Sequence, residues 1–247
     1  MYSLLPHRPQ LTFARLFVLP TMAFAVLYSF ATYCGLDNVL AGAIYHGSGD
    51  AWRLRHNPMF ETGIHQFGKG LSVAAWLGCL VELIRNREDG RSHPRQRALF
   101  LIVASVVTTT TLVSLAKGLT HMDCPWDLTA FGGQKIYVPL FERDLFNAKP
   151  GRCFPAGQAS AGYAWIALYF AALLYRPDVR RKGLVLGIAF GLVLGIAQQL
   201  RGAHFLSHDL ATAWIAWTVA AAFFAIMTRR TSVSSRVVYE KYPNLTS

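Results

Sequence analysis

Long apolar runs alternate with polar segments along the chain, and several runs reach the length that a helix needs to cross a bilayer. This pattern predicts an all-α polytopic membrane protein with six transmembrane helices, in which residues 1–247 form a single membrane domain. The predicted transmembrane helices cover, approximately, residues 16–34, 64–84, 98–116, 160–175, 183–200 and 210–227.

Two polar connections are much longer than the others and cover residues 35–63 and 118–159. Within the first, residues 38–45 are expected to form a short helix in the membrane interface. Within the second, glycines and prolines prevent one continuous helix. In the predicted fifth helix, glycines recur at every fourth position from 183 to 195, which predicts a bare strip where a neighbouring helix packs closely.

Composition agrees with a membrane protein and argues against a nucleic-acid partner. Hydrophobic residues make up 53% of the chain, charged residues only 15%, and the mean hydropathy is +0.31, which is too apolar for an ordinary soluble domain. The formal net charge of +11 is spread between the apolar runs instead of forming one basic stripe. We therefore expect membrane lipids and no nucleic acid as partners, and the sequence leaves the oligomeric state open.

The distribution of basic residues predicts the orientation of the chain. Fifteen of the 24 Lys and Arg residues fall on the side that holds both chain ends, and the other nine fall on the opposite side. The richer side of a membrane protein faces the cytoplasm. We expect a multi-pass protein of a bacterial inner (cytoplasmic) membrane with cytoplasmic N- and C-termini, so that the two long connections face the periplasm.

Three polar stretches on this outer side each carry a cation, namely Lys117, Arg152 and Arg201. A phosphoryl group under attack carries negative charge on its oxygens, so catalysis of its transfer needs fixed cations around it. Arginine clamps phosphate with two parallel hydrogen bonds, whereas lysine acts as a point charge. The three cations together predict a phosphate site.

His204 is the candidate nucleophile at this site, because an imidazole can attack phosphorus when a neighbouring group holds its ring in the right tautomer. His208 and Asp209 follow about one helical turn later, and either can hold the ring. The remaining isolated histidines are expected to be structural, and these include His7, His46, His56, His65 and His93.

Cys124 and Cys153 both fall in the second outer connection, where an oxidising compartment permits a disulfide. A bridge between them would close a loop of roughly thirty residues and stabilise the fold by about 3 kcal/mol in the chain-entropy model. Two free thiols are the alternative.

The three stretches resemble the signature of the type 2 phosphatidic acid phosphatase (PAP2) superfamily of integral membrane lipid phosphatases, which reads K-x6-R-P, then P-S-G-H, then S-R-x5-H-x3-D. The corresponding segments here are residues 117–125, 155–158 and 198–208. The resemblance implies six transmembrane helices and a metal-independent hydrolysis through a phosphohistidine, with no cofactor. It also implies that Lys117 binds phosphate and that His204 is the nucleophile.

The resemblance further implies that the backbone around Gly157 helps to cradle the phosphate oxygens. Two family arginines are missing, because Cys124 occupies the position in the first motif and Gln198 the position in the third. Arg201 lies one helical turn after the glutamine and can reach the same space. Arg152, beside the second motif, can replace the other arginine.

Two further departures concern the reacting groups. The position of the family aspartate holds His208, with Asp209 adjacent, so the partner of His204 is open. Gln158 replaces the family histidine that protonates the leaving oxygen, and the loss of a general acid costs about 10²- to 10⁴-fold in rate. Three interpretations are open: an engineered inactive His-to-Gln variant that holds substrate, a natural pseudo-enzyme, or a site in which His121 or His208 is the acid.

The expected function is therefore hydrolysis of a lipid phosphate or diphosphate at the outer leaflet. Candidate substrates are undecaprenyl diphosphate, phosphatidylglycerophosphate and a phosphate of lipid A. Phosphoryl transfer from one lipid to another is the alternative within the family, because the same phosphohistidine can serve it. A non-catalytic membrane protein that binds lipid phosphate is the alternative from another class.

Overall fold

The computed structural model describes residues 11–86, 93–142 and 151–241, with side chains up to residue 229. Residues 87–92, and residues 143–150 of the second outer connection, lie outside the described residues. The regular elements of the described chain are helices. The α-helices are α1 Leu19–Tyr33, α2 Leu36–Gly47, α3 Gly68–Arg85, α4 Pro94–Thr120, α5 Gly157–Tyr163, α6 Ala167–Tyr175, α7 Arg180–Leu200 and α8 Leu206–Lys241.

Shorter helical turns extend or join these helices. Two are π-helical and lead directly into α1 and α3, and the others are 3₁₀ turns within the connections. Their bounds are η1 Ala14–Val18, η2 Met59–Phe67, η4 Pro125–Asp127, η5 Thr129–Phe131, η6 Leu140–Glu142, η7 Ala164–Ile166 and η8 Pro177–Val179.

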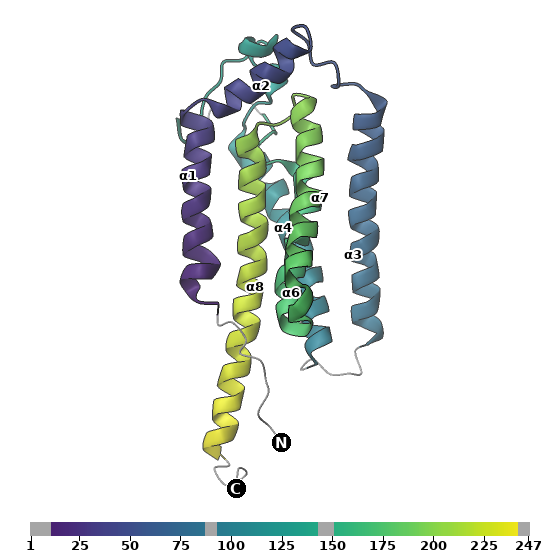
Figure 1. The fold of residues 1–247 in the computed structure, drawn as a ribbon, viewed down its shortest axis with the longest axis vertical. Coiled ribbons are helices and arrows are strands. Elements are labelled where there is room, and N and C mark those ends of the chain that lie inside the picture. The colour runs from purple at the N-terminus through teal and green to yellow at the C-terminus, as the bar shows by residue number, and fades with distance from the viewer. Residues whose placement is uncertain (1–10, 87–92, 143–150, 242–247) are drawn as a thin grey trace.

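The long helices run side by side along the longest axis of the molecule, and α2 lies across one end of the bundle (Figure 1). The connection between α7 and α8 lies at this end, whereas the start of α1 and the end of α8 lie at the opposite end. The arrangement therefore places α2 and the connection between α7 and α8 at one end of the bundle, and the start of α1 and the end of α8 at the other.

Five helical segments of the described chain are long and apolar enough to cross a membrane, and the chain is a multi-pass membrane protein by this pattern. Many of their apolar side chains point outward, as expected of helices whose solvent is lipid. The five segments are Ala14–Tyr33, Met59–Arg85, Pro94–Asp127, Pro177–Leu200 and Leu206–Arg229.

The fourth predicted transmembrane helix, residues 160–175, is divided between α5, the 3₁₀ turn η7 and α6 and is not one of these five segments. It is nevertheless the most buried part of the bundle, packed against α4, α7 and α8. Close backbone contact explains its position, since a Cβ at Gly162 or at Gly187 would lie 2.5 Å from backbone nitrogen of the facing helix. The glycine strip of α7 thus allows the segment 160–175 to pack closely against α7.

Candidate functional site

The three polar stretches border one cavity of about 400 Å³. The connection between α7 and α8, which forms part of its wall, lies at the α2 end of the bundle (Figure 1). Side chains of both charges, amides, two imidazoles and one indole line the cavity. The lining residues are Glu61, His65, Gln66, Lys117, Trp126, Arg152, Cys153, Gln158, Gln198, Arg201, Ala203 and His204.

Lys117 enters the cavity from the last turn of α4, which ends where His121 takes a left-handed backbone conformation with φ 50°. Its aliphatic part and its amine pack on the first residue of α5. A Cβ at Gly157 would lie 2.9 Å from Lys117 Nζ and 3.2 Å from Cδ. Because Gly157 has no Cβ, the Lys117 amine can lie against the backbone of the second motif.

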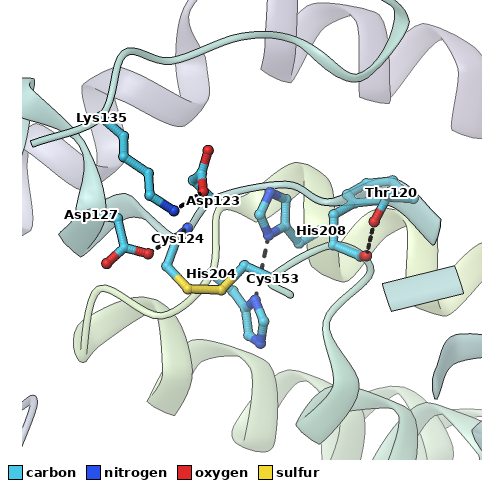
Figure 2. Close-up of a disulfide and its surroundings, with 9 residues drawn as sticks. Thr120, Asp123, Cys124, Asp127, Lys135, Cys153, His204 and His208 are labelled. Atoms are coloured by element: carbon cyan, nitrogen blue, oxygen red, sulfur yellow. Dashed lines mark hydrogen bonds and ion pairs between the residues drawn. A yellow bond between two sulfur atoms is a disulfide. The ribbon is translucent and has the colours of Figure 1, made fainter. Parts of the chain in front are cut away.

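The second stretch is fixed to the end of α4 by backbone hydrogen bonds and by a disulfide. The N–H of Cys153 donates to the carbonyl of Met122 at 3.0 Å, and the hydroxyl of Thr120 donates to the carbonyl of Phe154 at 2.6 Å. Cys153 is bonded to Cys124, and Figure 2 shows this disulfide beside the rings of two histidines. The bridge thus holds the first two motifs together at the cavity wall.

The third stretch turns sharply between α7 and α8 because Gly202 has a φ of 77°, where a side chain is strained. A Cβ there would also collide with the indole of Trp52. The carbonyl of Gly202 accepts a hydrogen bond from the N–H of Trp126 at 3.0 Å, and the N–H of Ala203 donates to the carbonyl of Gln198 at 2.9 Å. This turn fixes Arg201 and His204, which lie on either side of it.

The imidazoles of His204 and His208 face each other with their Nδ1 atoms 3.4 Å apart, and both residues are buried (Figure 2). The contact leaves Nε2 of His204 as the ring nitrogen that can face the cavity. Burial holds the pKa of His204 well below its usual range, and His208 and Lys117 lower it further against the opposing effect of the Cys153 carbonyl. The ring is therefore neutral near pH 7, as a nucleophile requires.

Asp209, the other predicted partner of His204, points away from the cavity toward α7. Its Oδ2 accepts a hydrogen bond from Nε2 of Gln199, and a Cβ at Gly195 would lie 2.5 Å from the same oxygen. Asp209 therefore ties α8 to α7, and His208 is the residue that contacts His204.

The predicted cations differ in how strongly the protein holds them. Arg201 is 8% exposed and donates from Nε and Nη2 to the carbonyl of Arg55 at 3.0 and 2.7 Å. Its Nη2 also lies 3.7 Å from a carboxylate oxygen of Glu61. Arg152 is exposed at the rim. With Lys117, the lining carries three positive charges against one negative charge, which favours an anion.

Gln198 and Gln158 occupy the cavity wall where the family motifs have charged residues. Oε1 of Gln198 accepts from Nη1 of Arg201 at 3.4 Å, while its Nε2 is buried with no hydrogen-bond partner among the described residues. Nε2 of Gln158 donates to the backbone carbonyl of His65 at 2.6 Å. The Gln198 amide thus offers a free donor in the described structure, whereas the Gln158 amide is hydrogen-bonded to main chain.

Five lining residues were not predicted as site residues, and three of them belong to the π-helical turn η2. The five are Glu61, His65, Gln66, Trp126 and Ala203. His121, one of the two predicted substitutes for the missing acid, is not among the lining residues, and the other, His208, lies behind His204. The η2 turn carries no motif, so its part in the cavity wall is visible only in the structure.

A second cavity of about 730 Å³ lies between α2 and the connection around Leu128 and Phe131. Its lining is mainly apolar and contains none of the residues of the three motifs. It therefore does not have the charges that a phosphate site needs.

Comparison with known families agrees with the positions of the motifs. The family model of the PAP2 superfamily matches residues 98–232, more than half of the chain, from α4 to α8. The match includes all three motifs but leaves out η2, which supplies one wall of the cavity. No curated protein and no solved structure matches the chain.

Proposed function

The chain belongs to the PAP2 superfamily, whose members are phosphatases, and we propose that it hydrolyses a lipid phosphate or diphosphate through a phosphohistidine at His204. The observation that carries the proposal is the common cavity. A neutral imidazole borders the same 400 Å³ space as three cations contributed by three separate stretches of chain.

The cations and the unpartnered amide give the phosphate its binding site in this proposal. Lys117, Arg152 and Arg201 neutralise the phosphoryl oxygens, and Nε2 of Gln198 donates to one of them at the position of a family arginine. Each of these donors also meets the charge that develops in the transition state, where fixed donors are most effective.

The chemical step needs no metal ion in this proposal. Nε2 of His204 attacks phosphorus, and a nitrogen–phosphorus bond forms as the phosphorus–oxygen bond to the lipid breaks. His208 holds the ring from the other side through the contact between the Nδ1 atoms. Water then attacks phosphorus, the nitrogen–phosphorus bond breaks, and inorganic phosphate leaves.

We further propose six membrane crossings, with α5, η7 and α6 together forming one of them, and with both termini in the cytoplasm. The charge distribution supports this orientation, and the cavity at the α2 end then faces the periplasm of a bacterial inner membrane. Two very exposed apolar residues support a lipid substrate. Phe67 and Leu119, 71% and 70% exposed, lie within two residues of the cavity residues Gln66 and Lys117.

Gln158 favours a second candidate function, the binding of a lipid phosphate without hydrolysis. Its amide lacks a titratable proton, so it cannot protonate the leaving oxygen as the family histidine does. A site with intact cations and no acid would retain affinity for the phosphorylated lipid while losing turnover.

The test is phosphate release by the protein purified in detergent, with phosphatidic acid and undecaprenyl diphosphate as substrates. Release that disappears in His204→Asn, together with an acid-labile phosphorylated protein trapped from labelled substrate, is the expected result. No release above His204→Asn, combined with unchanged binding of the lipid, would instead establish the binding protein. An added acceptor lipid that becomes labelled would identify a phosphotransferase.

A further inference from the structure

The cavity contains a second imidazole that the family motifs do not include. Among the described residues, His65 and His204 are the histidines that line it. His65 lies in η2, which leads into α3 and packs against α7, where a Cβ at Gly68 would collide with Leu194. This close packing leaves η2 little freedom to move away from the cavity.

Gln158 and His65 are joined directly. The Gln158 amide donates a 2.6 Å hydrogen bond to the backbone carbonyl of His65 and so holds this residue beside the position where the family has its acid. The bond uses the amide and leaves the imidazole of His65 free to meet a ligand in the cavity. π-helical turns often occur at functional sites, because their wider turn re-aims side chains.

The two imidazoles share their surroundings. Lys117, His65 and His204 line the same cavity of about 400 Å³. Glu61 and Arg201, with a carboxylate oxygen and Nη2 3.7 Å apart, line it as well. A phosphate bound to Lys117 would therefore meet an imidazole from each of two separate elements.

We propose that His65 is the general acid of this site and donates a proton to the leaving oxygen in place of the histidine that the family has at position 158. The inference rests on the proposed function. When Nε2 of His204 attacks phosphorus and the phosphorus–oxygen bond breaks, the leaving oxygen takes the proton of His65 and the lipid alcohol departs. His65, now neutral, takes a proton from the water that attacks the phosphohistidine, so the acid is restored when phosphate leaves.

The experiment compares two substrates that differ in their need for an acid. Phosphatidic acid has an alkoxide leaving group that must be protonated, whereas p-nitrophenyl phosphate releases a phenolate that leaves without a proton. His65→Gln is expected to lower kcat for phosphatidic acid by about 10²- to 10⁴-fold and to change kcat for p-nitrophenyl phosphate less than about tenfold. His56→Gln, from the same connection but outside the cavity lining, is the matched control and should change neither.

An equal loss on both substrates, or no loss on either, would overturn the role of His65. The His65→Asn variant and a thermal unfolding midpoint like that of the starting protein guard against a folding defect. The fall in the rate with phosphatidic acid on the basic side of the pH profile should disappear in His65→Gln, and its persistence would equally overturn the proposal. Failure of the proposed function looks different, because the starting protein and His204→Asn would then release phosphate at the same rate.

Discussion

The Nδ1 atoms of His204 and His208 lie 3.4 Å apart in the buried wall of the cavity. This contact orients the proposed nucleophile, because it fixes which ring nitrogen of His204 is left for phosphorus. Removing the partner in His208→Ala should lower kcat by about 10²- to 10⁴-fold with little change in KM, as expected for a group that orients a nucleophile. Phosphate release at saturating lipid checks this, and a rise in KM at constant kcat would contradict it.

The Asp209→Asn variant tests whether Asp209 orients His204 or holds α8 against α7. Asp209 faces Gln199 and Gly195 on α7, so its loss should weaken the contact between α7 and α8 by about 1–3 kcal/mol. The effect on kcat should be smaller than that of His208→Ala. Thermal unfolding in detergent and kcat, measured on the same preparations, decide between the two roles.

Gly157→Ala should weaken phosphate binding without unfolding the protein. The new Cβ would lie 2.9 Å from Lys117 Nζ, and a flexible lysine can move away only by leaving its position at the cavity. Losing one charge-assisted hydrogen bond should raise KM about tenfold to hundredfold. Steady-state kinetics with phosphatidic acid measure this change.

Gly162→Ala is the matched control for that substitution. Its Cβ would meet the backbone nitrogen of Gly191 at 2.5 Å, and backbone cannot move aside as a lysine can. The expected result is a loss of stability of about 1–3 kcal/mol from overpacking, seen as a lower thermal midpoint. A similar KM change in both variants would show that the Gly157 effect is not specific to Lys117.

Breaking the disulfide should loosen the cavity wall as well as the fold. Cys124 and Cys153 are 29 residues apart, and a crosslink of this span stabilises by about 3 kcal/mol in the chain-entropy model. A reducing agent should therefore lower the thermal midpoint and the phosphatase activity together. The variant with serine at both positions should show the lower values from the start and no response to the reductant.

Acidification should destabilise the fold through His204. Its pKa in the folded protein is well below the usual 6.5 because the ring is buried, so the unfolded chain takes up the proton first as the pH falls. This contribution to the free energy of unfolding is complete above about pH 6.5 and is lost progressively below it. Unfolding by denaturant at pH 5.5 and 7.5 should show a smaller difference in His204→Gln than in the starting protein.

The helical membrane architecture follows from the sequence more directly than the details of the site. Apolar runs long enough to cross a bilayer mark five of the six predicted helices, because lipid-facing helices need apolar side chains along their whole length. Residues 160–175 were harder to predict in detail. Their apolar composition does not reveal that the segment contains a 3₁₀ turn or that it packs at the centre of the bundle.

The orientation of His204 depends on a helix boundary that periodicity does not define. Side chains four residues apart share a face only within one helix, and α8 begins at Leu206, after His204. Sequence spacing therefore does not distinguish His208 from Asp209 as the partner of His204. The contact of Arg201 with the Arg55 carbonyl spans 146 residues, and no sequence spacing encodes it.

The hydrogen bond from Gln158 to the main chain of His65 joins the part of the chain that the family model matches to a part that it leaves out. A chimera that keeps residues 98–232 but takes its first two membrane helices from a relative would exchange one side of the pocket. Such a chimera would replace the proposed acid, His65, while keeping the proposed phosphate-binding residues Lys117, Arg152 and Arg201.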